Sequence, residues 1–178
     1  MNLRTIEKAG PAYEYRWPLY FFISVAFWNL VGAGVFGFLI NPPIILYYIQ
    51  GINTTPIHAH TALFGVYGLL AIALMLFSVR HIFKKDAWSD SLLKWCFWGL
   101  NGGIFLMTVI SLIPSGFYQF YHAVSKGMWY ARSPEIASGD FIRTVSWLRM
   151  GPDIIFVSGA FCLLAFLARG IWRSFIKK

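Results

Sequence analysis

Two histidines separated by a single residue are the side chains of this sequence that are best suited to metal chemistry. They are His58 and His60, and Thr55 and Pro56 precede them. Threonine is a favoured helix N-cap and proline favours the first helical position, so this pair predicts the start of a helix. The uncharged apolar run Ile57–Val79 is about 23 residues long, which is enough to cross a bilayer. Both histidines are therefore expected in the first turns of a membrane-spanning helix.

On a helix, His58 and His60 point in nearly opposite directions, because each residue advances about 100° around the axis. On a strand the same spacing would place both rings on one face, where they could chelate one ion. If the two helical histidines bind metal, each serves a different centre, with the metals on the order of 10–15 Å apart. Two haems flanking one helix fit this requirement most directly. The alternative is that both histidines lie at the wet interface of a membrane helix.

The composition is that of an integral membrane protein. The 178 residues are 58% hydrophobic and 12% charged, with a mean hydropathy of +0.60, whereas soluble domains carry about 25% charged residues. The net charge of +8 comes from basic residues that flank apolar runs, so membrane topology explains it better than binding to nucleic acid. Cys96 and Cys162 form no C-x-x-C motif, so a redox or zinc site is not expected.

One membrane domain over residues 1–178 is expected, with four transmembrane helices and an all-α fold. The approximate spans are 17–40, 57–79, 95–121 and 151–168. The segment Ile44–Gln50 is too short to span and should lie along the membrane surface. Gly32–Gly37 is a literal G-x-G-x-x-G, but no strand precedes it, so these glycines indicate close approach of a helix or cofactor. Asn29 should have a hydrogen-bond partner across a helix interface.

The distribution of basic residues predicts the orientation. Arg80–Lys85 and the C-terminal tail are basic, so both should be cytoplasmic. With four spans, the expectation is a multi-pass protein of the inner (cytoplasmic) membrane with both termini cytoplasmic and the two histidines in its outer part. The third loop should also face outward, and it contains Arg132, Arg143 and Arg149. Arginine pairs well with carboxylates, so haem propionates are candidate partners. A mixed polar loop balanced by its own acidic residues is an equal alternative.

Four segments in order resemble one known family. They are Phe27–Phe38; His58-Ala59-His60 with Gly65-Val66-Tyr67-Gly68; Tyr121-His122 with Ala131-Arg132-Ser133; and Trp147-Leu148-Arg149-Met150. Through them the sequence resembles the catalytic subunit of respiratory nitric oxide reductase, within the haem–copper oxidase superfamily. The resemblance covers nearly the whole chain and corresponds to the last four core helices of the large-subunit fold of that superfamily.

The resemblance implies roles for both histidines and a set of cofactors and partners. His58 corresponds to the proximal ligand of the high-spin haem at the active site, and His60 to an axial ligand of the low-spin haem. The family reaction reduces nitric oxide to nitrous oxide, with electrons from quinol or cytochrome c. The implied cofactors are up to two b-type haems, shared with upstream helices, and a non-haem iron that belongs only to the complete enzyme.

The sequence also departs from the family pattern. The family's three non-haem iron ligands and the second ligand of its low-spin haem lie on earlier helices, and His81 and His122 match none of these positions. The resemblance therefore implies a C-terminal portion with no complete catalytic site, which needs the N-terminal portion or a separate chain that carries it. Two other interpretations stay open: a non-catalytic b-type haem protein that transfers electrons, and an inert truncated membrane remnant.

Overall fold

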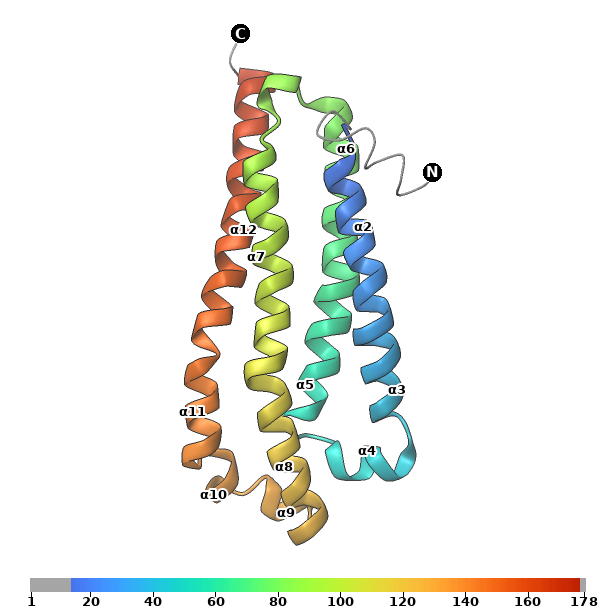
Figure 1. The fold of residues 1–178 in the computed structure, drawn as a ribbon, viewed down its shortest axis with the longest axis vertical. Coiled ribbons are helices and arrows are strands. Elements are labelled where there is room, and N and C mark those ends of the chain that lie inside the picture. Colours follow the sequence, from blue (N-terminus) through green and yellow to red (C-terminus); the bar gives the residue numbers. More distant parts are fainter. Residues whose placement is uncertain (1–13, 177–178) are drawn as a thin grey trace.

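The computed structural model describes residues 14–176, and within that range the chain is helical without strands. Four helical spans in it are long and apolar enough to cross a membrane: Arg16–Ile40, Thr54–Ile82, Asp90–Lys126 and Asp140–Ile176. They alternate in direction, so the start of the first span and the end of the fourth lie at the same end of the molecule (Figure 1). This is the all-α, multi-pass membrane architecture that the apolar runs predicted.

The first two spans each contain a wider, π-helical stretch. The first consists of α2 (Arg16–Trp28), the π-helical Asn29–Phe36 and α3 (Gly37–Ile40). The second consists of α5 (Thr54–Ala59), the π-helical His60–Gly68 and α6 (Leu69–Ile82). These two π-helical stretches pack against each other.

The third and fourth spans extend beyond the expected limits at both ends. The third consists of α7 (Asp90–Met107), the π-helical Thr108–Leu112 and α8 (Ile113–Lys126); the fourth consists of α11 (Asp140–Leu148), α12 (Met150–Ile171) and a last π-helical turn, Trp172–Ile176. Polar residues continue the helices past the apolar runs, because a helix keeps its backbone hydrogen bonds where it leaves the membrane. Three short helices complete one end: α4 (Pro43–Ile49), α9 (Met128–Ala131) and α10 (Pro134–Ala137).

The prediction that Thr55 caps the second span was wrong. Asn53 occupies the N-cap position and the helix begins at Thr54, so Pro56 is its third residue. The hydroxyl of Thr55 instead donates to the Ile49 carbonyl at 3.3 Å. The cause is the tight turn after α4, which places that carbonyl next to the start of α5. The short helix α4 lies across the lower end of the spans, as the length of its apolar run suggested (Figure 1).

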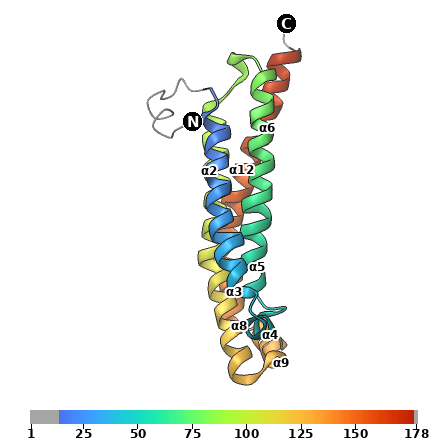
Figure 2. The same cartoon turned by 90° about the vertical axis from the view of Figure 1, so that its right-hand side faces the viewer.

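The four spans pack as two pairs, α2 with α6 and α7 with α12, and the two pairs lie against each other (Figures 1 and 2). The α7–α12 pair is the closer one, because glycines let the two backbones meet. A Cβ atom added at Gly99 would lie 2.7 Å from the Gly159 Cα, and one at Gly103 would lie 2.6 Å from the Phe156 Cβ. Between the pairs, Phe21, Leu69, Leu100 and Phe166 belong to one buried apolar cluster.

Ion pairs join the spans at the upper end. Arg16 and Asp90 pair at 2.9 Å, which links the first and third spans. Glu14 lies 3.2 Å from both Arg80 and Lys85. The hydrogen bond from Lys85 and the charge of Arg80 hold the pKa of Glu14 below its ordinary value. The basic segment Arg80–Lys85 is thus held by ion pairs to Glu14, the first residue that the structure describes.

The amide that bridges the helices is Asn101, whereas Asn29 is exposed. The Trp28 indole nitrogen donates to the Asn101 side-chain oxygen at 2.9 Å, and the Asn101 amide donates to the Phe97 carbonyl at 2.9 Å. The expectation for Asn29 was therefore wrong. Its position one residue after Trp28 turns it about 100° away from the interface that Trp28 faces.

Trp28→Phe should lower the free energy of unfolding by about 1–3 kcal/mol, because the Asn101 carbonyl oxygen loses its donor inside the protein. The measurement is denaturant titration of the chain in mixed micelles. Trp98→Phe is the matched control, since Trp98 is 61% exposed, and it should change the value by less than about 0.5 kcal/mol. Equal losses for the two variants would show that the hydrogen bond contributes nothing.

Candidate functional site

The two histidines lie within one turn of each other near the start of the second span, and Figure 1 shows α5 at the lower end of that span. His58 belongs to α5, and His60 begins the π-helical stretch that follows. Both side chains are half-buried. Widened helical turns occur frequently at functional sites. The local helix is therefore the kind of element that could hold both rings in fixed directions.

His58 faces the first span. Its Nδ1 donates to the Gly32 carbonyl at 2.9 Å, and a Cβ at Gly37 would lie 3.1 Å from its Cε1. The two helices can come this close because a Cβ at Gly32 would lie 2.6 Å from the Thr61 carbonyl carbon. The glycines at 32 and 37 thus allow the second span to approach the first closely, as their spacing predicted. Glycine leaves the room that the imidazole of His58 occupies.

His60 faces the fourth span instead. Its Nδ1 donates to the Pro56 carbonyl at 2.8 Å, and its Nε2 lies 3.4 Å from Nη2 of Arg149. A guanidinium can only donate, so Nε2 is the acceptor of this contact. The prediction that the two rings point in different directions is confirmed, since their partners lie on different helices.

Both rings share one hydrogen-bonding arrangement. In each, a backbone carbonyl accepts from Nδ1, which leaves the lone pair on Nε2. Metal-ligating histidines almost always donate their second ring N–H to a carbonyl, carboxylate or water in this way, and the donation fixes the ring's tautomer and orientation. The contacts with Gly32 and Pro56 were not foreseen. The glycine motif was the only signal for the first, and the second joins residues four apart on a helix.

The three arginines that the sequence offered as partners for haem propionates lie in different surroundings. Arg149 is 33% exposed at its side chain and pairs with Asp153 at 3.3 Å, beside His60. Arg143 is exposed and pairs with Asp140 at 2.6 Å. Arg132 lies against the turn at Gly51, where a Cβ would come 3.0 Å from its Nη2. The structure therefore brings Arg149 to a histidine and places the other two elsewhere.

Comparison with known proteins identifies the family. The sequence model of the cytochrome c and quinol oxidase polypeptide I family matches residues 3–155. The chain belongs to this family. It is also 26% identical over 152 residues to a nitric oxide reductase subunit of Stutzerimonas stutzeri, an alignment that covers 79% of this chain and 30% of that protein. The chain thus spans about a third of the length of this curated relative.

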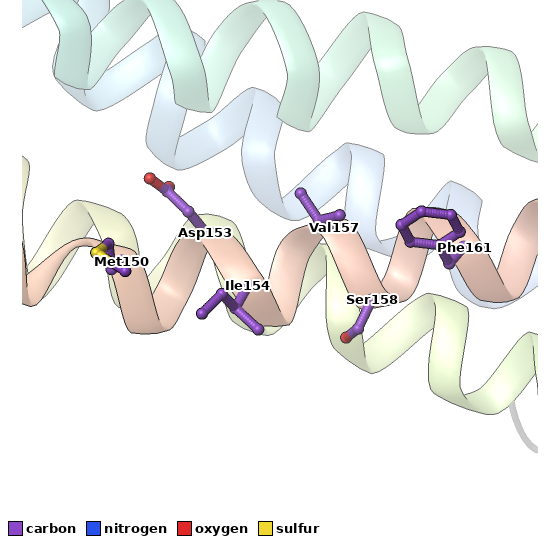
Figure 3. Close-up of a pocket in the computed structure, with 6 residues that line it drawn as sticks. All are labelled: Met150, Asp153, Ile154, Val157, Ser158 and Phe161. Carbon is purple, nitrogen blue, oxygen red and sulfur yellow. The ribbon is translucent and has the colours of Figure 1, made fainter.

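An open hollow of about 390 Å³ lies along α12. Its lining comes from this helix alone, between Met150 and Phe161, and is almost entirely apolar. Asp153, the carboxylate that pairs with Arg149, is one of the lining residues, and Val157 lies one turn further along the same side of the helix (Figure 3). The hollow is therefore connected to the contact between His60 and Arg149 only through the ion pair of Asp153 with Arg149.

The other two histidines lie away from this pair. His81 is exposed at the upper end, where its ring nitrogens lie 3.3 and 3.4 Å from the Tyr15 hydroxyl. His122 lies among tyrosines at the lower end, with ring centroids 4.7 Å from Tyr118 and 5.6 Å from Tyr130. Residues 14–176 contain no group of three or more histidine, cysteine, aspartate or glutamate side chains placed to hold a metal ion.

Proposed function

We propose that this chain is the haem-ligating portion of a nitric-oxide-reductase-like membrane oxidoreductase, with His58 and His60 each ligating the iron of a different b-type haem. The observation that carries the proposal is the shared arrangement of the two imidazoles. Each has its Nδ1–H held by a backbone carbonyl, and the rings face different helices. Membership of the oxidase family and likeness to the Stutzerimonas stutzeri nitric oxide reductase subunit support this reaction class.

The residues present fit haem by their donor chemistry. Neutral imidazole nitrogen is a standard axial ligand of haem iron, and both Nε2 atoms carry the lone pair that ligation needs. At His60 this nitrogen now contacts Arg149 at 3.4 Å, so ligation there requires the guanidinium to move aside. Once released, it would be available to pair with haem carboxylates. Haem, when bound, supplies an iron that accepts and releases single electrons.

The chain's own residues would position and insulate these groups. The Gly32 and Pro56 carbonyls set the ring orientations, and one short helical segment fixes the separation of the two ligands. Asp153 holds Arg149 next to His60, which places positive charge where an anionic group would come. Quinol or cytochrome c is the proposed electron donor, and the inner membrane, with cytoplasmic termini, is the proposed location.

The proposal is tested by producing the chain together with the portion of the curated relative that it does not span. The complemented preparation should show low-spin and high-spin haem bands and should consume nitric oxide when a reductant is present. The chain purified alone should have no such activity, because the family's remaining iron ligands lie on upstream helices. Haem bands without nitric oxide consumption would favour an electron-transfer protein, whereas the absence of haem from both preparations would contradict ligation altogether.

A further inference from the structure

One corner of the molecule, where α8 meets α9 and α10, concentrates buried polar atoms without partners. Five buried side-chain nitrogens and oxygens in the described part of the chain have no hydrogen-bond partner, and three of them are His122 Nδ1, Arg132 Nε and Ser133 Oγ. These residues are close in the fold, since Tyr130 contacts the His122 ring and its carbonyl accepts from the Ser133 backbone N–H at 3.0 Å. Buried polar groups are normally satisfied, so this concentration indicates a ligand.

Arg132 carries a positive charge at this corner without a counter-charge. Within residues 14–176 its guanidinium forms neither an ion pair nor a hydrogen bond. The acidic residue nearest in sequence, Glu135, accepts from the Tyr130 hydroxyl at 2.8 Å. The guanidinium packs on Gly51, whose φ of 74° belongs to the left-handed region that favours glycine. The turn at Gly51 therefore makes room for a partly buried arginine that still needs an anion.

An apolar pocket of about 210 Å³ opens beside the same turn. Ile49 and Thr54, the two ends of the turn that contains Gly51, both line it. The rest of its wall comes from α3, α4, α5 and α8 and the stretch before α3, and includes Phe36, Ile45, Ile57 and Phe117. The exposed surface of this wall is almost purely carbon. Phe117 is 63% exposed, so the pocket is open at the outer surface of the helices.

We propose that this corner binds one phospholipid, with an acyl chain in the pocket between α4 and α8 and the headgroup phosphate at Arg132. The phosphate oxygens would accept from the guanidinium of Arg132 and from the hydroxyl of Ser133, which would supply partners at two of the three residues. A quinol fits less well, because its neutral ring gives the guanidinium no counter-charge and the pocket wall exposes almost no polar surface to its hydroxyls. Exposed Trp129 and Tyr121 place the corner at the depth of an interfacial aromatic belt, where phosphates lie.

The test is a lipid titration of the full chain in detergent, followed by native mass spectrometry. The probes are phosphatidylglycerol, the diacylglycerol with the same acyl chains, and inorganic phosphate. Phosphatidylglycerol should bind one per chain and more tightly than either of the others. Arg132→Gln should weaken its binding by about tenfold or more, since a charge-assisted hydrogen bond is lost. Arg143→Gln is the matched control and should leave the affinity unchanged, because Arg143 is exposed and already paired with Asp140.

A second variant tests the pocket independently of the charge. Ile45→Trp fills the pocket and should weaken the binding of phosphatidylglycerol while leaving the helical circular dichroism unchanged. If Arg132→Gln fails to fold, this variant alone tests whether the lipid occupies the pocket. The proposal would be overturned if diacylglycerol or inorganic phosphate bound as tightly as phosphatidylglycerol. It would also be overturned if Arg132→Gln and Arg143→Gln had equal effects on the affinity for the lipid. So would loss of haem in Arg132→Gln with unchanged lipid affinity, which would place Arg132 at a haem propionate.

Discussion

His60→Ala should abolish the low-spin haem spectrum of the complemented preparation, whereas His58→Ala should retain it and lose the high-spin haem instead. The reason is geometric. His60 donates to the Pro56 carbonyl and His58 donates to the Gly32 carbonyl, and the two rings face different helices. Neither imidazole can substitute for the other, because a two-residue offset on a helix turns the side chain by about 200°. The measurement is the visible spectrum of oxidised and dithionite-reduced protein, with haem content determined on the same sample.

The matched control for both variants is His81→Ala. His81 is exposed at the opposite end of the same helical span, so its loss removes an imidazole without touching the proposed ligands. Its spectrum should equal that of the unsubstituted chain. If His60→Ala retained the full low-spin band, or if both ligand variants lost the same band, the assignment of two separate haems to one helix would be wrong.

Gly99→Val should lower the free energy of unfolding by about 3 kcal/mol or more, through overpacking where two backbones meet. A Cβ at Gly99 would lie 2.7 Å from the Gly159 Cα and 2.9 Å from its nitrogen. These are backbone atoms of α12, so no side chain can rotate away to relieve the contact. The two helices would have to separate, and the aromatic and aliphatic packing on both sides of the glycines would be lost with them.

Gly102→Val gives the comparison for the same substitution in the same helix. A Cβ at Gly102 meets no heavy atom within 4 Å, so only the difference in helix propensity remains, which is below about 1 kcal/mol. Denaturant titration in mixed micelles measures both variants. If Gly102→Val destabilised the chain as much as Gly99→Val, the cause would be the valine itself, and the close α7–α12 contact would contribute little to stability.

Local pattern was enough to predict the architecture. Three of the expected spans are uncharged apolar runs with the length of a bilayer crossing, the fourth is a shorter apolar run that begins after Asp153, and a helical span lies where each of them does. Helical periodicity alone required His58 and His60 to face apart. The errors also have local causes. Thr55 has the residue type of a cap, but the sequence does not reveal the Ile49 carbonyl that takes its hydroxyl. Asn29 and Asn101 are both amides within apolar runs, and nothing local tells which of them faces a helix.

The sequence by itself thus determined the number and type of spans, the family likeness and the different directions of the two imidazoles. All of these follow from composition, run length, motifs and the helical repeat. The tertiary structure decided which groups meet those imidazoles. The contact of His58 with the Gly32 carbonyl joins residues 26 apart, and that of His60 with Arg149 joins residues 89 apart. Such contacts depend on how whole helices pack, and no periodicity within one helix encodes its neighbour.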